Sequence, residues 1–311
     1  MNPVPGLRLT LNEPLRLHTR FGIGGAAGLL AEAFTEDAFL TALAAAQDRK
    51  IPLAMIGGGS NLVVSDHGFP GMVLRFLGDR ICSDGTSVSA EAGAELQALV
   101  DFSITQGLRG LETMTGIPGW VGAAIYGNAG AYGHSISERV SQVRYWDGEA
   151  VRSANGEQCR FAYRESIFKQ RKDWFIFSAG LAMEPADPSE LKKTAYEIRR
   201  IRDAKYPPSM RCAGSIFKNC LVAGLPASVV QQVPARLIRE GKIPSAWFLE
   251  QVEAKGMRRG DIQVASYHAN LIYNDGNGTA ADLCHLIREL KQRVLVRFGF
   301  ELEEEVQYVG F

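Results

Sequence analysis

The chain lacks several features that would assign it to a common structural class. Its longest apolar runs fall short of the roughly 18 residues that a membrane-spanning helix needs. No charged lead followed by a long apolar run opens the sequence, so we expect no signal peptide. Lys plus Arg equals Asp plus Glu at 34 each, so no net field favours nucleic acid or an anionic membrane. We therefore expect a cytoplasmic protein that binds neither.

Cysteine and histidine are also too few and too scattered for a metal site. The five cysteines are odd in number and contain no Cys-x-x-Cys pair, and the five histidines include no His-Glu-x-x-His. Such a set argues against a disulfide framework and against zinc, and it is typical of a reducing cytoplasm. The 311 residues are enough for two or three domains with a sizeable core.

Glycine, in contrast, is concentrated in two stretches. The first contains Ile56, Gly57, Gly58, Gly59, Ser60, Asn61 and Leu62. Three consecutive glycines let main-chain N–H groups approach a bulky anion such as a pyrophosphate, and the following Ser and Asn add side-chain donors. The alternative for this stretch alone is a tight hairpin between two strands.

The second stretch is longer and has the same character. It contains Thr115, Gly116, Ile117, Pro118, Gly119, Gly122, Ala123, Asn128, Gly130 and Ala131. Residues this small cannot fill a core by bulk, so they favour a flat or phosphate-bearing ligand lying against the main chain. A third pattern, Gly22-x-Gly24-x-x-Ala27, matches the loose dinucleotide fingerprint, but residues 15–20 are too polar for the preceding central strand, which disfavours a Rossmann fold.

Periodicity and capping residues predict the main elements. Helical patterns are found at residues 35–49, with Thr35 as the cap, at 94–106, at 189–204, with Ser189 as the cap, and at 279–298. A hairpin is predicted by residues 143–151, with an Asp-Gly pair in its turn. The prolines at 207 and 208 break the third helix and predict a domain boundary.

Three polar motifs could carry chemistry. They are Tyr-Arg-Glu-Ser-Ile-Phe at 163–168, Gly-Ser-Ile-Phe-Lys-Asn at 214–219, and Glu-Leu-Glu-Glu-Glu-Val at 301–306. Each also has an ordinary interpretation when taken alone: an arginine at a strand end, a serine in a turn, and a solvated acidic run. His268, in a Tyr-His-Ala-Asn segment that we expect to be a strand, is structural by default.

Together the two glycine stretches resemble the halves of a vanillyl-alcohol-oxidase-type FAD-binding domain. With the three polar motifs, nearly the whole chain resembles the UDP-N-acetylenolpyruvoylglucosamine reductase family, the UDP-N-acetylmuramate dehydrogenases. The resemblance implies an α+β fold with two α/β FAD-binding subdomains, 1–78 and 79–208, and a C-terminal α+β substrate domain, 209–300. The tail, 301–311, is expected to return to the active site.

The resemblance also implies the reaction and the residues that carry it. NADPH would reduce a non-covalent FAD, with no bond to His67, and the chain would convert UDP-N-acetylglucosamine enolpyruvate to UDP-N-acetylmuramate for peptidoglycan synthesis. Arg164 would bind the enolpyruvyl carboxylate, Ser215 would donate a proton, and Glu305 would share one. Both glycine stretches would bind the cofactor. The substrate contacts would be Tyr163, Arg164, Lys218, Asn219, Lys255 and His268.

The chain departs from the family pattern after Asn219. The chain has an insertion at 220–245, with expected helices at 225–233 and 236–240. Because of this insertion, the family pattern does not identify the residues that bind the substrate diphosphate. Arg164 and Ser215 are 51 positions apart, which resembles the shorter variant without a tyrosine-bearing loop and predicts a more open pocket. The alternatives are an FAD-dependent sugar or alcohol oxidase and a non-catalytic nucleotide-sugar sensor. We expect a monomer.

Overall fold

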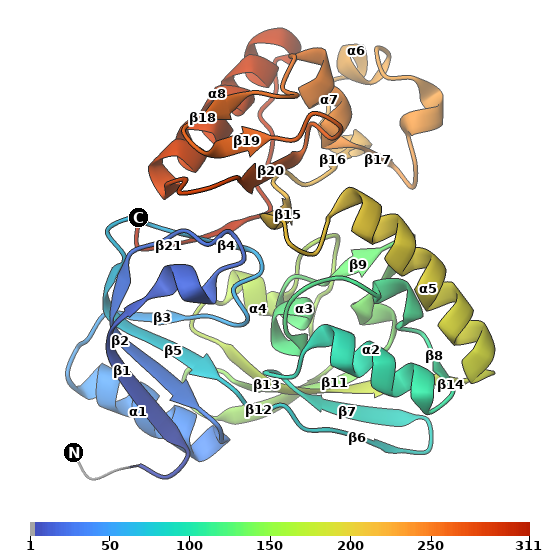
Figure 1. The fold of residues 1–311 in the computed structure, drawn as a ribbon. Helices are drawn as coiled ribbons and strands as arrows, with labels where there is room; N and C mark the ends of the chain where they lie inside the picture. The colour runs from blue at the N-terminus through green and yellow to red at the C-terminus, as the bar shows by residue number, and fades with distance from the viewer. Residues whose placement is uncertain (1–3) are drawn as a thin grey trace. The chain divides into compact units, whose positions relative to one another are not determined.

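The computed structural model describes residues 4–311, which divide into two compact units. The N-terminal unit comprises the chain up to Glu13 together with Ala27–Gly59 and Pro70–Pro208, and the C-terminal unit comprises Pro14–Ala26, Ser60–Phe69 and Ser209–Phe311 (Figure 1). The expected boundary after residue 208 coincides with the division between the units. The further division of the first 208 residues at 78 stays a prediction.

The first sheet of the N-terminal unit has the strand order β1-β2-β5-β3, and α1 lies beside it in Figure 1. Its elements are β1 (Leu7–Pro14), β2 (Ala26–Ala33), α1 (Glu36–Asp48), β3 (Leu53–Met55) and β5 (Phe69–Phe76). Thr35 caps α1 as predicted, because its side chain accepts a hydrogen bond from the amide of Ala38 at 3.2 Å. The fully buried Phe39 of α1 stacks on Phe175 of the second sheet, with 4.2 Å between ring centroids. The two sheets therefore share one core.

The second sheet is antiparallel and has the order β12-β11-β13-β7-β6. Its strands are β6 (Ile81–Asp84), β7 (Ser87–Glu91), β11 (Val140–Trp146), β12 (Val151–Asn155) and β13 (Phe175–Ala182). The helices of this region are α2 (Leu96–Thr105), α3 (Val121–Tyr126), α4 (Ile167–Gln170) and α5 (Pro188–Lys205), with the 3-10 helices η2 (Glu112–Met114) and η3 (Ile136–Glu138). Short strands form two further pairs: β8 (Leu108–Arg109) with β14 (Glu184–Pro185), and β9 (Gly130–Ala131) with β10 (His134–Ser135).

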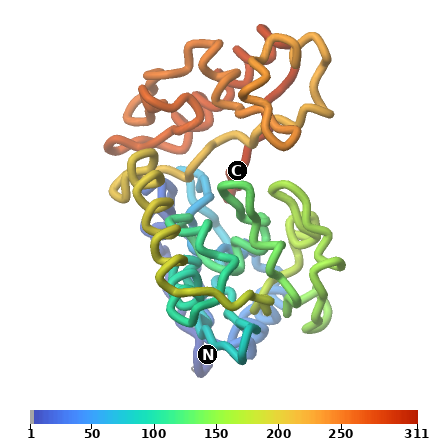
Figure 2. Tube along the Cα trace, turned by 90° about the vertical axis from the view of Figure 1, so that its right-hand side faces the viewer, coloured from blue at the N-terminus to red at the C-terminus, as the bar shows by residue number. Residues whose placement is uncertain are grey.

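Helices α2 and α3 lie over one face of this second sheet in Figure 1, and Figure 2 shows α5 running along the side of the same unit. The predicted hairpin is confirmed as β11 and β12. The predicted α5 is also present, but its cap is wrong: Asp187, not Ser189, accepts the hydrogen bond, from the amide of Ser189 at 2.8 Å. Pro188 follows in the first helical position, where its fixed φ suits helix entry.

The C-terminal unit has its own sheet and core. The sheet order is β15-β20-β19-β18, and β4 pairs in parallel with β21. The strands are β4 (Leu62–Val64), β15 (Arg211–Ser215), β16 (Cys220–Leu221), β17 (Lys242–Ile243), β18 (Arg258–Arg259), β19 (Ile262–Val264), β20 (Leu271–Asn274) and β21 (Gln307–Val309). The helices are α6 (Ala227–Val230), α7 (Ser245–Gln251) and α8 (Ala280–Phe298), with η1 (Leu15–His18), η4 (Val222–Gly224) and η5 (Ala235–Leu237). The core includes Phe21, Ile23 and Val63 from the first 70 residues.

Two expectations for individual segments are wrong, and one interpretation that the sequence disfavours is excluded. The helices expected at 225–233 and 236–240 are shorter in the structure, where they are α6 and η5. Pro226 and Pro234 are the N-caps of these two segments, and α6 ends before Pro234. His268 lies before β20 rather than on it. The Gly22-x-Gly24-x-x-Ala27 pattern leads into β2 and not into a helix, which excludes the dinucleotide interpretation.

The described part of the chain contains no helix with both the length and the apolar character to cross a bilayer.

Candidate active site

The first glycine stretch connects two strands that belong to different sheets. β3 ends at Met55 and pairs with β5, whereas β4 begins at Leu62 and pairs with β21. Because the two flanking strands have different partners, the hairpin interpretation is wrong. Gly57, Gly58 and Gly59 belong to the N-terminal unit, and the residues that follow belong to the C-terminal unit.

The two glycine stretches meet in the N-terminal unit. A Cβ atom placed on Gly58 would lie 2.9 Å from Cδ1 of Trp120, and one on Gly57 would lie 3.5 Å from Cβ of Ala123. Trp120 in turn lies against the buried Arg75, whose guanidinium carbon is 4.7 Å from the ring centroid. Burial lowers the pKa of Arg75, and the carboxylate of Glu32, 3.3 Å away, partly offsets that effect. Trp120 lies within the second glycine stretch, but neither Trp120 nor Arg75 was predicted as a site residue.

The residues at this junction fit a flavin cofactor. Within residues 4–311, the main-chain amides of Gly57, Gly58 and Gly59 donate no hydrogen bond, whereas the preceding Ile56 amide donates to the carbonyl of Leu74 at 3.1 Å. Gly57 and Gly58 are half-buried, as are the residues at 116–119 of the second stretch. Unsatisfied amides on a half-open glycine loop are a suitable donor set for a pyrophosphate.

Arg164 lies in a tight turn with a strained backbone. Ala162 and Glu165 exchange main-chain hydrogen bonds of 3.0 and 3.1 Å, and Arg164 between them has φ +58°, which is uncommon outside glycine. Lys169 stabilises the turn by donating from Nζ to the carbonyl of Arg164 at 2.9 Å and to Oε1 of Glu165 at 3.0 Å. A strained conformation held by so many contacts is common at functional positions.

The same turn is fixed to the second glycine stretch. Arg164 donates from Nη2 to the carbonyl of Gly130 at 3.1 Å, and Asn128 donates from Nδ2 to the carbonyl of Ala162 at 2.8 Å. Ser166, fully buried, caps α4 and donates from Oγ to the carbonyl of Tyr126 at 2.7 Å. The expected carboxylate-binding arginine and the expected cofactor residues of 128–131 are therefore brought together in one unit.

In the C-terminal unit, Ser215 ends β15 opposite Leu271 of β20, after an irregularity in the pairing. The motif that follows is held by Asn270, which is 3% exposed. Asn270 accepts from the amide of Phe217 at 2.9 Å, and donates to the carbonyl of Phe217 at 2.8 Å and to Oγ of Ser245 at 2.7 Å. Asn270 belongs to the Tyr-His-Ala-Asn segment, but this role was not predicted, because its partners are 53 and 25 positions away.

The C-terminal tail returns to the Ser215 motif. The amide of Glu305 donates to the carbonyl of Ile216 at 2.7 Å, and the amide of Lys218 donates to the carbonyl of Glu303 at 2.9 Å. A single bridge between Phe217 and Glu304 joins the two segments, so Glu303 and Glu305 flank a bridged residue and do not lie on a regular strand. The structure therefore brings Glu305 beside the residue that follows Ser215.

Lys218 lies within this arrangement. Its side chain is 6% exposed and forms an ion pair with the more exposed Glu303. Burial, and secondarily the charge of Glu303, raise the pKa of the nearby Cys220 to about 12. Asn219 is exposed on the same loop.

The other expected substrate residues of this unit lie elsewhere in it. Lys255 is 40% exposed and pairs with Glu250 at 2.7 Å. His268 lies in the turn between β19 and β20, where its amide donates to the carbonyl of Ala265 at 3.4 Å.

Comparison with known proteins identifies both parts of the chain. Residues 27–155 match the FAD binding domain family, and residues 206–309 match the UDP-N-acetylenolpyruvoylglucosamine reductase C-terminal domain family. The UDP-N-acetylenolpyruvoylglucosamine reductase of Solibacter usitatus is 59% identical, over 99% of this chain and 98% of that protein. The reductase of Caldanaerobacter subterraneus is 34% identical, over 97% and 94%.

A solved structure agrees with the sequence relatives. The crystal structure of UDP-N-acetylenolpyruvylglucosamine reductase from Thermus caldophilus superposes with a TM-score of 0.75 at 26% identity, and covers 97% of this chain and 98% of that one. The expected fold class, an FAD-binding domain with a C-terminal substrate domain, is confirmed. The chain thus belongs to the UDP-N-acetylenolpyruvoylglucosamine reductase family, FAD-dependent oxidoreductases that use NADPH to reduce UDP-N-acetylglucosamine enolpyruvate in peptidoglycan synthesis.

Proposed function

We propose that Arg164, Ser215 and Glu305 carry out the reduction in this chain. The observation that supports the proposal best is the hydrogen bond of 2.7 Å between the Glu305 amide and the Ile216 carbonyl. It joins the two segments that bear the proposed proton donors, although they are 90 positions apart in the sequence. Arg164 is held independently, by its turn and by Gly130.

Arg164 would bind the carboxylate of the enolpyruvyl group. A guanidinium has a planar fork of donors that matches two carboxylate oxygens, and it keeps its charge at any physiological pH. When FAD is bound and reduced, it supplies the hydride that the vinyl ether accepts. Negative charge then grows on the carboxylate, and a fixed cation stabilises that charge more than it stabilises the starting substrate.

Ser215 and Glu305 would manage the protons. Ser215 would give the proton of its Oγ to the carbon next to the carboxylate, which completes the lactyl ether. Glu305 would hold or share a proton with the carboxylate while charge develops there. A serine hydroxyl is a weak acid, and the cation of Lys218, three residues along the same buried segment, would stabilise its anion. General-acid help of this kind contributes on the order of 10²–10⁴-fold.

The test separates the two halves of the reaction. Ser215→Ala should leave the bleaching of the flavin by NADPH intact, because the reduction of the flavin does not use the proton that Ser215 gives to the substrate carbon. Reoxidation of the bleached flavin by UDP-N-acetylglucosamine enolpyruvate should slow by about 10²-fold or more. The exposed Ser87→Ala is the control, with both steps unchanged. Normal reoxidation in Ser215→Ala would remove Ser215 from the mechanism.

Cofactor and substrate contacts are proposed for the residues that the family resemblance indicates. FAD would be held by Ile56, Gly57, Gly58, Gly59, Ser60, Asn61, Leu62, Thr115, Gly116, Ile117, Pro118, Gly119, Gly122, Ala123, Asn128, Gly130 and Ala131. The substrate would also contact Tyr163, Lys218, Asn219, Lys255 and His268. The unused amides of Gly57 to Gly59 support the first group, and the buried charge of Lys218 supports the second.

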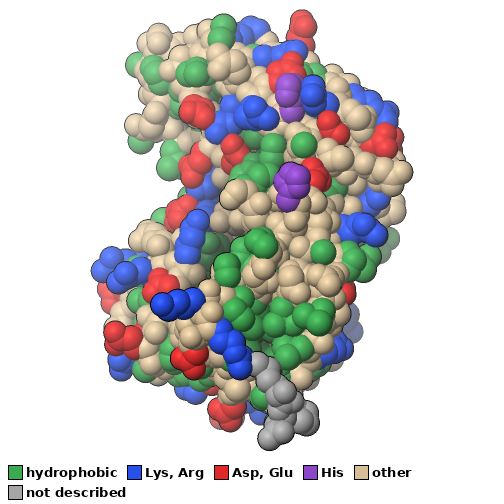
Figure 3. Space-filling model, turned by 90° about the vertical axis from the view of Figure 1, so that its left-hand side faces the viewer, with side chains coloured by type: hydrophobic (Ala, Val, Ile, Leu, Met, Phe, Trp, Pro, Cys, Tyr) green, Lys and Arg blue, Asp and Glu red, His purple; other side chains and the backbone are tan. Residues whose placement is uncertain are grey.

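We further propose a cytoplasmic monomer that binds neither nucleic acid nor membrane. On the face that Figure 3 shows, basic and acidic side chains are interspersed, which matches the balanced composition. The five cysteines are free thiols, as a reducing compartment would keep them. Light scattering of the purified protein would test the monomer, and a dimer mass would contradict it.

A further inference from the structure

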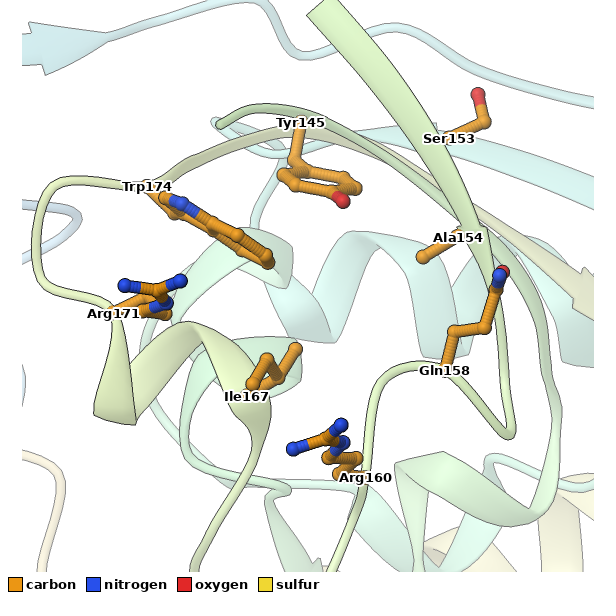
Figure 4. A pocket seen from close by; sticks show the side chains of 8 residues that line it. All are labelled: Tyr145, Ser153, Ala154, Gln158, Arg160, Ile167, Arg171 and Trp174. Atoms are coloured by element: carbon orange, nitrogen blue, oxygen red, sulfur yellow. The ribbon is translucent and has the colours of Figure 1, made fainter. Parts of the chain in front are cut away.

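The N-terminal unit contains a pocket that the proposed chemistry does not use. It has a volume of about 320 Å³ and is bounded by the hairpin β11–β12 and the segment that follows it (Figure 4). Its lining residues are Tyr145, Ser153, Ala154, Gln158, Arg160, Ile167, Arg171 and Trp174. This volume is at the lower end of the range for small-molecule sites, and suits one ring system with one charged arm.

One wall of the pocket is aromatic and well supported. The rings of Tyr145 and Trp174 have centroids 4.8 Å apart and are tilted by 32°. Phe168, fully buried, makes a T-shaped contact with Tyr145, with 5.2 Å between the ring centroids. Rings fixed in this way offer a flat ligand a stacking surface at little cost in side-chain entropy.

The remaining wall carries two arginines, Arg160 and Arg171. In Figure 4 the side chains of Arg160 and Arg171 lie on either side of Ile167. Within the described residues neither guanidinium makes an ion pair or a hydrogen bond, and that of Arg171 lies 5.5 Å from the centroid of Trp174. The arginines of the adjacent hairpin differ, because Arg144 and Arg152 pair with carboxylates at 2.8 Å. The two cations that line the pocket are thus the ones left available for an anion.

The pocket is continuous with the turn that bears Arg164. The carbonyl of Cys159 accepts from the amide of Ile167 at 2.8 Å, and this bond closes residues 159–167 into a loop. Arg160 and Ile167, at the two ends of the loop, line the pocket, while Arg164 lies at its tip. Arg160 has φ +48°, so one end of the loop is itself in a strained conformation.

We propose that this pocket binds a small aromatic anion, a single ring system bearing a phosphate or carboxylate, and that its occupancy steadies the Arg164 turn. The ring stacks on Tyr145 and Trp174, and the anionic group accepts hydrogen bonds from Arg160 and Arg171. A ligand that bridges the two ends of the loop adds a further contact that stabilises its strained conformation, and so favours the form in which Arg164 binds the substrate. The binding claim stands on the pocket alone, and the effect on catalysis rests on the proposed role of Arg164.

Calorimetric titration of the FAD-bound enzyme with phenyl phosphate tests the binding claim. The wild type should bind phenyl phosphate more tightly than inorganic phosphate, which lacks the ring. The double variant Arg160→Gln/Arg171→Gln should weaken binding of phenyl phosphate by about tenfold or more, because it removes both charge-assisted partners. Arg152→Gln, an exposed arginine outside the pocket, should leave binding unchanged. All three arginines are exposed, and thermal unfolding verifies that the variants are folded.

Several results would overturn the binding claim. One is equal affinity of the wild type and the double variant, and another is no detectable heat in the wild type. Binding at the substrate site would instead be weakened by Arg164→Gln and not by the double variant, which would also overturn it.

Turnover measurements test the effect on catalysis. Phenyl phosphate should lower the KM for the enolpyruvyl substrate by about fivefold, the lower range of measured couplings between sites, and should have no effect in the double variant. An unchanged or raised KM in the wild type would overturn the claimed effect on catalysis. The claim that the pocket binds phenyl phosphate would still be decided by calorimetry. If Arg164→Lys bound the enolpyruvyl substrate normally, the proposed function would fail and the calorimetric result would stand.

Discussion

Asn61 donates its side-chain amide to the carbonyl oxygen of Glu305 at 2.9 Å, across 244 positions of the sequence. The amide of Gln307 donates back to the carbonyl of Asn61, also at 2.9 Å. These two hydrogen bonds lie at the start of the parallel pairing between β4 and β21, in the C-terminal unit. One residue of the first glycine stretch therefore fixes the main chain of the proposed catalytic glutamate.

The first prediction concerns this bond. Asn61→Asp keeps the size of the side chain but turns a donor into an acceptor that faces a carbonyl oxygen. We expect it to cost about 1–3 kcal/mol of stability, measured by urea unfolding, and to slow flavin reoxidation by the enolpyruvyl substrate. Asn61→Ala, which removes the donor without adding repulsion, should be milder. If both variants unfold and turn over as the wild type does, the bond does not position the tail.

The second prediction concerns the contact between the glycine stretches. Gly58→Ala would place a methyl group 2.9 Å from Cδ1 and 3.0 Å from Nε1 of Trp120, a ring that also contacts the guanidinium of Arg75. Overpacking of this kind costs about 1–3 kcal/mol, so we expect roughly tenfold weaker retention of FAD, measured by the visible spectrum after dialysis.

Gly224→Ala is the matched control for Gly58→Ala. No atom lies within 4 Å of the position that its new Cβ would take, and its φ is not positive. It should retain FAD as the wild type does. If Gly58→Ala retained FAD as well as the wild type does, the two glycine stretches would be shown to accommodate the methyl group without weakening cofactor binding.

Local signals in the sequence predicted local structure well. The cap Thr35 accepts a hydrogen bond from an amide three residues on, as its position before the helix indicated. The cap of α5 was misplaced by two positions, although Asp187 followed by Pro188 is itself a strong start signal. Motif resemblance indicated Ser215 and Glu305, whose segments the structure joins, and the roles of the two side chains stay predictions.

What the sequence could not provide is the set of contacts made between distant segments. Nothing around Asn270 indicates that it grips the main chain of Phe217, and nothing around Trp120 indicates that Gly58 packs on its ring. Both depend on tertiary packing, which no local pattern encodes. The insertion was misjudged for a different reason: its apolar spacing suggests helices, but Pro226, Pro234 and Pro244 are the N-caps of short helical segments, and a proline cannot continue a helix that precedes it.

The third prediction is a pH dependence at the β11–β12 turn. The amides of Ala150 and Glu149, together with Arg152, hold the pKa of Asp147 at about 2, below its usual 3.8. A carboxyl with a depressed pKa in the folded state stabilises the fold above its unfolded pKa, and this contribution is lost as the pH falls through the folded pKa. The difference in melting temperature between the wild type and Asp147→Asn should therefore be present at neutral pH and shrink between about pH 4 and pH 2. A constant difference across that range would contradict it.

The last prediction concerns Lys218, whose buried ammonium pairs with the exposed Glu303. If its charge lowers the pKa of the Ser215 hydroxyl, removing the charge should slow proton donation to the substrate carbon. We expect Lys218→Met to reduce the rate of flavin reoxidation by about 10–100-fold, within the range of general-acid effects. Lys218→Arg keeps the charge with a different shape and should restore part of the rate. Glu303→Gln keeps the cation and should slow reoxidation far less than Lys218→Met does. Wild-type reoxidation in Lys218→Met would assign the lysine to structure alone, and an equal loss in Glu303→Gln would assign the effect to the ion pair rather than to the ammonium.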